Sequence, residues 1–207
     1  MTATLLRKIS IPGSADRGMC DVLIQNGIIK KIAQDIDPPK GADVIETEGK
    51  ILLPGLIDCH VHFREPGLEH KATMQTESRA ALAGGVTTAC EMPNTVPATV
   101  TVAALADKVR RATDIEDMDL RFYFGVTQEA HLFALKELWT GESGEHRRLK
   151  ARCCGVKLYL DHSTGNQKVD GGIVEEIFVA CKQLGIPLIA HCEDPDMNAA
   201  AAAAEKD

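Results

Sequence analysis

The chain has 207 residues, which is enough to bury one large domain or one domain and part of a second. Hydrophobic residues make up 44% and charged residues 26%, as in an ordinary folded protein, and no apolar run approaches membrane-spanning length. The net charge is −7 and the lysines and arginines are scattered, which argues against a nucleic acid or an anionic membrane surface as the main partner.

The cysteines predict a reducing compartment. There are seven, an odd number, and two of them, Cys153 and Cys154, are adjacent. This pattern suits neither a disulfide framework nor a structural zinc site built from Cys-x-x-Cys pairs. The first residues, from Met1 to Lys8, lack the apolar core of a secretion signal. We therefore expect a cytoplasmic protein.

Residues 1–52 predict a small β-sandwich segment. The apolar run Cys20–Gln25 is followed by Asn26-Gly27, the strongest short hairpin signal, and the chain then returns through Ile28–Ile32. Another short strand is expected over 43–46. We expect this segment to form a β layer that precedes the main domain, which would span 53–207.

Beyond residue 50 the pattern changes to strands that alternate with helices. Strands are predicted over 51–62, 86–92, 120–126, 153–160 and 186–192, and helices over 73–83, 101–112, 128–139 and 173–184. The strands recur roughly every thirty residues, the period of βα units with parallel strands. Either a (β/α)8 barrel or a doubly wound sheet fits this period.

The positions of the polar residues favour the barrel. They fall at the carboxyl ends of the predicted strands, which meet at one mouth of a barrel, where active sites form. About five βα units are present where a complete barrel has eight, and the sequence ends in a run of alanines that reads as the start of a helix. We expect an α/β barrel of TIM type that is truncated relative to its complete fold.

The most informative motif is His60-Val61-His62, directly after a buried strand. Residues two apart on a strand point to the same side, so the two imidazoles can hold one divalent metal. Arg64 has the same parity and could direct a cation into the same space, which suggests an anionic substrate. An isolated His-x-His is more often solvent-facing or hydrogen-bonded than a metal site, so the further candidates decide its interpretation.

Three later strands supply those candidates. His191 closes the apolar strand 186–192, and Lys157 stands inside another, where lysine is rare unless it is paired or functional. A desolvated Lys157 would favour the neutral amine, which can react with carbon dioxide to give an anionic carbamate that bridges two metals. Asp161 is an anionic alternative that needs no modification, and the residues alone do not decide between the two. Asn94 follows a third strand, either as a turn residue or as an amide donor to substrate.

Taken together, these residues resemble a known family. The run Asp58–Gly67, the segment Met92–Thr95, the strand-borne Lys157 and the run His191–Asp194 resemble the dihydroorotases of the amidohydrolase superfamily. The resemblance covers roughly residues 10–198. Related enzymes that open hydantoins, dihydropyrimidines or allantoin share the His-x-His motif but usually lack the arginine two residues later.

The resemblance implies a role for each candidate. Two zinc ions would be held, the more buried one by His60 and His62 and the second by His191. A carboxylated Lys157 would bridge them, with Asp161 ranked second because some relatives use an aspartate there. Arg64 and Asn94 would hold the substrate carboxylate. The N-terminal segment would be half of a β-sandwich that the family builds from both chain ends.

The reaction implied is the reversible cyclisation of N-carbamoyl-L-aspartate to L-dihydroorotate in pyrimidine biosynthesis, and many relatives are homodimers. The family also uses a histidine after the sixth strand and a proton-shuttling aspartate after the eighth. Neither has a counterpart in these 207 residues. We therefore expect this chain by itself to lack a general base and to bind the second zinc weakly.

Two alternatives remain. The first is another cyclic amidohydrolase, of the allantoinase or dihydropyrimidinase type, and Arg64 argues against it. The second is a dihydroorotase-like scaffold that no longer catalyses. Such a scaffold is expected to have lost its metal ligands, yet all four ligands that the resemblance implies for this span are present.

Overall fold

The computed structural model describes residues 2–13, 18–162 and 166–205. It divides the chain into two compact units, Met1–Pro54 and Gly55–Asp207, and each is described by itself. Within those described ranges, no helix combines the length and the apolar character needed to cross a bilayer.

The first unit is a four-stranded sheet of β1 (Ala3–Ile9), β2 (Cys20–Gln25), β3 (Ile28–Ala33) and β4 (Asp43–Glu46), in the order β3-β2-β1-β4. Strands β1 and β4 run parallel and the other pairs antiparallel. The predicted hairpin is confirmed: Asn26 and Gly27 both have positive φ, 52° and 75°, as a two-residue hairpin turn requires. Leu5, Leu23 and Ile36 form a small core on this sheet.

The second unit alternates strands with helices. Its strands are β5 (Leu56–Val61), β6 (Val86–Glu91), β7 (Asp119–Gly125), β8 (Cys153–Tyr159) and β9 (Leu188–His191). Its α-helices are α1 (Met74–Ala83), α2 (Val102–Arg111), α3 (Glu129–Thr140), α4 (Gly144–Arg152), α5 (Val174–Leu184) and α6 (Pro195–Ala204). Two short 3-10 helices, η1 (Ala112–Asp114) and η2 (Gly171–Ile173), lie beside α2 and α5.

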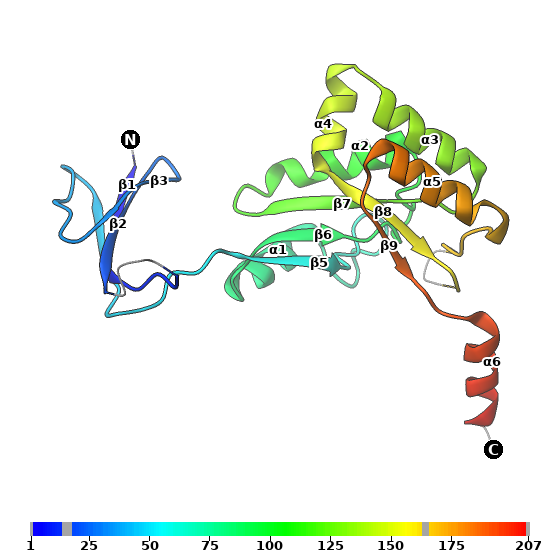
Figure 1. The fold of residues 1–207 in the computed structure, drawn as a ribbon, viewed down its shortest axis with the longest axis horizontal. Helices are drawn as coiled ribbons and strands as arrows, with labels where there is room; N and C mark the ends of the chain where they lie inside the picture. The colour runs from blue at the N-terminus through cyan, green and yellow to red at the C-terminus, as the bar shows by residue number, and fades with distance from the viewer. Residues whose placement is uncertain (1, 14–17, 163–165, 206–207) are drawn as a thin grey trace. The chain divides into compact units, whose positions relative to one another are not determined.

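The sheet of this unit is parallel throughout, in the order β5-β6-β7-β8-β9. Strand order follows chain order without the reversal that defines a doubly wound sheet. Helices α2–α5 lie along one side of the sheet (Figure 1), and the main core packs between them and the strands. A sequential parallel sheet with its helices on one face is the arrangement of a (β/α)8 barrel, here with five strands. The predicted fold class is confirmed.

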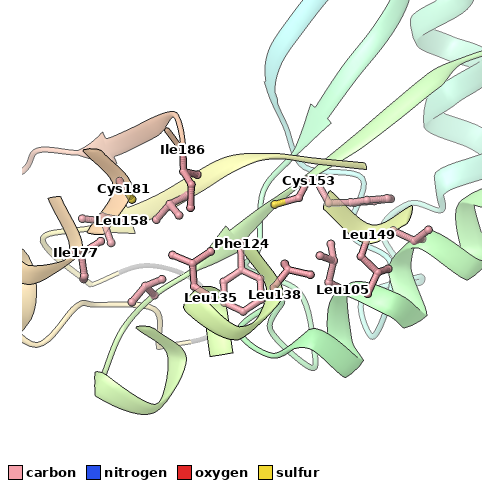
Figure 2. Packing of buried hydrophobic residues seen from close by; sticks show 14 of the residues in the cluster. Leu105, Phe124, Leu135, Leu138, Leu149, Cys153, Leu158, Ile177, Cys181 and Ile186 are labelled. Carbon is pink, nitrogen blue, oxygen red and sulfur yellow. The ribbon is translucent and has the colours of Figure 1, made fainter. Parts of the chain in front are cut away.

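The main core follows from the two-residue period of the strands. In β7, Phe122 and Phe124 point to the helices and are fully buried, whereas Tyr123 between them belongs to a separate cluster. Figure 2 shows leucines of the helices, including Leu135 and Leu138 of α3, packed around Phe124. One face of the sheet therefore packs against the helices, most fully along β7 and β8, and the opposite face is available for polar side chains.

Two predictions of secondary structure were wrong in detail. The strand expected over 51–62 is confined to 56–61, because Pro54 and Gly55 interrupt the run before it. Helix α4 was not predicted, since Leu149 is its one buried residue and the rest of its sequence is mostly charged, so it shows no apolar stripe. Ser143 caps this helix by accepting a hydrogen bond from the His146 amide.

A buried ion pair anchors the carboxyl end of β6. The Nζ atom of Lys108 lies 2.6 Å from Oε2 of Glu91, and both side chains are 1% exposed. Lys108 also donates to the backbone oxygen of Met92 at 3.0 Å. Helix α2 is thereby fastened to the strand end from which the candidate residue Asn94 follows.

We expect Lys108→Met to lower the free energy of unfolding by about 3–5 kcal/mol, because it leaves a buried carboxylate without its partner. Arg110→Met on the same helix is the matched control: its side chain is 67% exposed and pairs with Asp107 at the surface, so the loss should stay below about 1 kcal/mol. Urea unfolding of both variants measures the difference. Equal losses for the two variants would contradict the prediction.

Candidate metal centre

Four predicted ligands share the helix-free face of the five-stranded sheet. Val61, Leu158 and Ala190 all pack toward the core beneath the helices. Their neighbours along the chain therefore point to the opposite face: His60 from β5, His62 directly after it, Lys157 from β8 and His191 from β9. All four lie at or near the carboxyl ends of their strands, which is the end where barrel enzymes build their active sites.

The three imidazoles gather at this face. The ring centroids of His60 and His62 are 5.3 Å apart, and those of His60 and His191 are 5.5 Å apart. Two imidazoles that share one tetrahedral zinc through nitrogens at about 2.1 Å have centroids about 5 Å apart. Among the described residues, no three His, Cys, Asp or Glu side chains already form a metal-binding set. The imidazoles are thus near the spacing of ligands, with Lys157 needed to complete the donor set.

Lys157 is 2% exposed, and its Nζ atom lies 4.9 Å from the centre of the Tyr159 ring. Within the described ranges, no hydrogen bond or ion pair to this Nζ atom is found. Burial lowers the pKa of the Lys157 amine, against the smaller opposing effect of Cys192 and Glu193. Burial thus makes the neutral amine, the form that reacts with carbon dioxide, easier to reach than in an exposed lysine.

The two histidines of β5 are also biased toward the neutral, metal-binding form. Burial lowers the pKa of His60, and the positive charge of Lys157 lowers it further. Burial lowers the pKa of His62, with the charge of Arg64 as the next cause. A neutral imidazole has the free lone pair that a metal requires.

The loop after β5 presents Arg64 in a left-handed conformation, with φ of 68°. This conformation is uncommon for a residue with a side chain and must be held by its surroundings. The next residue provides the anchor: Glu65 accepts a hydrogen bond from the Met74 amide at 2.9 Å and forms an ion pair with Arg111 at 3.1 Å. The charge of Arg64 reaches the site, as its effect on His62 shows.

Asn94 follows β6 and is 5% exposed. Its Oδ1 atom lies 2.9 Å from Nδ1 of His62. The structure thus brings this predicted residue into direct contact with a predicted ligand. That contact was not anticipated from the sequence, which gives no distance between the loops after two different strands.

Asp161, the alternative to Lys157, has other partners. Its carboxylate accepts hydrogen bonds from the Asn198 side chain at 2.9 Å and from the His162 amide at 2.7 Å. These contacts lower the pKa of Asp161, with Asn198 as the largest cause. Lys157, in contrast, acts on the pKa of both His60 and His62. By strand parity Lys157 lies on the sheet face that carries His60 and His191, whereas Asp161 is bonded to Asn198 and His162.

Sequence reasoning missed Tyr159. This residue is 1% exposed, its ring meets His191 edge to face at a centroid distance of 5.4 Å, and its hydroxyl has no partner within the described residues. It shares the parity of Lys157 on β8, so it extends the same face of the strand. The two-residue spacing from Lys157 could therefore have indicated from the sequence that Tyr159 lies beside the candidate site.

Comparisons with known proteins identify the relatives of this chain. A family model described as "Dihydro-orotase-like" matches residues 49–207. A dihydroorotase of Methanosarcina acetivorans is 36% identical over 178 residues, which is 86% of this chain and 36% of that protein. A dihydroorotase of Methanosphaera stadtmanae is 34% identical over 181 residues, 86% of this chain and 38% of that protein. The chain thus spans little more than a third of these curated relatives.

Solved structures agree with the fold. An L-hydantoinase (dihydropyrimidinase) of Arthrobacter aurescens has a TM-score of 0.80 and 25% identity, over 95% of this chain and 42% of that one. A D-hydantoinase (dihydropyrimidinase) of Thermus sp. has a TM-score of 0.73 and 26% identity, over 93% of this chain and 41% of that one.

In the metal-free protein, we expect NMR titration to give His60 and His62 pKa values below 6.5. The unfolded chain then binds more protons than the folded one, so their contribution to stability is complete above about pH 6.5 and falls as the pH drops toward the folded values. Lys157→Met should raise both pKa values, because it removes a nearby positive charge. A value of 6.5 or more for either histidine in the unmodified protein would contradict the prediction.

Proposed function

Because this chain belongs to the dihydro-orotase-like family, we propose that it carries the metal ligands and the carboxylate-binding residues of a zinc-dependent dihydroorotase. Such an enzyme interconverts N-carbamoyl-L-aspartate and L-dihydroorotate in pyrimidine biosynthesis. The observation that carries the proposal is the convergence of three imidazoles and the buried Lys157 on the helix-free face of the sheet.

The donor set suits two zinc ions. His60 and His62, adjacent on β5, would hold one, and His191 on β9 would hold the other. Imidazole nitrogen and an anionic oxygen bridge are donors that zinc prefers. When bound, the metals supply Lewis acidity: they activate water as the nucleophile and polarise the carbonyl of the ring amide.

Lys157 would provide the bridge after modification. Its neutral amine nitrogen adds to the carbon of carbon dioxide, a nitrogen–carbon bond forms, and one proton leaves to solvent. The product is a carbamate, whose anionic oxygens would be available as donors to the metals. The burial of Lys157 and the lowered pKa of its amine support this step.

Arg64 and Asn94 would bind the substrate carboxylate. The guanidinium of Arg64 offers paired N–H donors to an anion, and the amide of Asn94 adds another donor. An uncharged cyclic amide cannot use these contacts, so the pair would select L-dihydroorotate over dihydrouracil or hydantoin. The higher identity to dihydroorotases than to hydantoinases supports the same choice.

The wider setting follows from the same resemblance. The cysteine usage supports a cytoplasmic location, the substrate is a small molecule, and the family supports a homodimer. The N-terminal unit, placed by the sequence pattern at 1–52, would be one half of a composite β-sandwich.

Metal binding tests the ligand set. We expect His60→Asn to weaken zinc affinity by more than about 100-fold, beyond the loss typical of an outer-shell group, because it removes a direct donor. His70→Asn is the matched control, since His70 is exposed on the loop that follows the same strand. Competition with a chromophoric chelator measures both affinities. Absence of zinc binding by the unmodified protein would favour the non-catalytic scaffold.

Ligand binding tests the substrate. We expect the zinc-loaded protein to bind L-dihydroorotate more tightly than dihydrouracil. Arg64→Met should lower the affinity for L-dihydroorotate about 10–100-fold and leave the affinity for dihydrouracil unchanged. Arg79→Met, at an exposed position of α1, is the control. Binding is the readout because it reports directly on the contact between Arg64 and the substrate carboxylate. Equal affinity for the two compounds would favour another cyclic amidohydrolase.

A further inference from the structure

The contact between His62 and Asn94 fixes which nitrogen of the imidazole is free. The Oδ1 atom of Asn94, 2.9 Å from Nδ1 of His62, can only accept a hydrogen bond. The proton of the neutral imidazole must therefore reside on Nδ1, which donates it to Asn94. The lone pair of His62 is then on Nε2, and Nε2 is the atom available to a metal.

The backbone around Asn94 holds the amide in place. Lys108 donates to the oxygen of Met92 at 3.0 Å, and the amides of Thr95 and Thr99 both donate to the oxygen of Pro93 at 2.9 Å. With Asn94 itself 5% exposed, its side chain has little freedom to turn away from His62.

The other end of the amide is uncommitted. Nδ2 of Asn94 carries two N–H donors, and no hydrogen bond from it to a described residue is found. Because Oδ1 is directed to His62, Nδ2 must point elsewhere, and on this face the charge of Arg64 is close enough to act on the same histidine. In the proposed function, this free donor pair binds the substrate carboxylate together with Arg64.

We propose that Asn94, beyond the carboxylate-binding role that the proposed function gives it, is a positioning residue: its Oδ1 atom holds His62 so that Nε2 faces the metal. This inference rests on the proposed function, since it assigns the metal and the substrate to the same site. It makes Asn94 a positioning residue for one ligand as well as a binding residue, so that metal geometry and substrate recognition depend on one side chain.

Two substitutions of Asn94 separate the role of its Oδ1 atom from the role of its Nδ2 atom. Asn94→Asp keeps an acceptor for His62 but replaces the donor end with a negative oxygen. Asn94→Leu removes both ends at similar volume, and Asn94→Ala does the same without added bulk if the leucine does not fold. Thr95→Val is the matched control, since Thr95 is equally buried and bonds to Pro97, away from His62.

For zinc, we expect Asn94→Leu or Asn94→Ala to weaken binding 10–100-fold, the usual loss when an outer-shell partner of a histidine ligand is removed. Asn94→Asp and Thr95→Val should stay within about threefold, because the acceptor survives in both. The affinity of the zinc-loaded protein for L-dihydroorotate should fall about 10-fold or more in Asn94→Asp, since the carboxylate of the new aspartate would face the substrate carboxylate.

The ring nitrogens of His62 give a readout that needs no metal. In long-range ¹H–¹⁵N spectra of the metal-free protein at pH 8, His62 should be the Nδ1–H tautomer, and it should lose that preference in Asn94→Leu or Asn94→Ala but not in Asn94→Asp. Unchanged zinc affinity and an unchanged tautomer in the leucine and alanine variants would overturn the positioning role. Unchanged L-dihydroorotate affinity in Asn94→Asp would overturn the donor role. Failure of the unmodified protein to bind zinc would instead overturn the proposed function.

Discussion

The alternation of side chains along parallel strands governs both the core and the candidate site. Helices cover one face of the five-stranded sheet, so every second residue must be apolar and packed, as Phe122 and Phe124 are in β7. The residues between them cannot contribute to that core. At the carboxyl ends of β5, β8 and β9, those intervening positions hold the histidines and Lys157. The candidate site thus lies on the sheet face opposite the helices, at the positions that alternate with the core residues.

Two buried lysines differ in their partners. Lys108 is 1% exposed and Lys157 is 2% exposed, so both lie where an unpaired ammonium is costly. Lys108 meets Glu91 at 2.6 Å and fastens α2 to β6. Lys157 lies on the sheet face that carries the imidazoles, 4.9 Å from the centre of the Tyr159 ring, a contact that favours the ammonium. Within the described residues no ion pair to Lys157 is found, and burial lowers the pKa of its amine.

The candidate site depends on neighbouring strands being held in register. Met92 donates to the oxygen of Val61 at 3.0 Å, which aligns the end of β6 with the end of β5. That alignment sets Asn94 against His62, and the anchoring of Glu65 by α1 and α2 fixes the backbone that carries Arg64. The proposed metal ligands and the proposed carboxylate-binding groups therefore depend on the same backbone hydrogen bonds. A shift in the backbone of the loop after β5 or the loop after β6 would therefore displace both groups of side chains.

The sequence by itself determined the period of strands and helices, the hairpin at Asn26-Gly27 and the family, because these depend on local patterns and on the motif around His60. It missed α4, whose charged surface hides its single buried leucine. It was the tertiary structure that showed a sequential sheet with helices α2–α5 along one side, and that set Lys157 on the sheet face that carries His60. It alone set Asn94 against His62. Distances between the ends of different strands arise from sheet pairing and packing, and no local pattern in the chain encodes them.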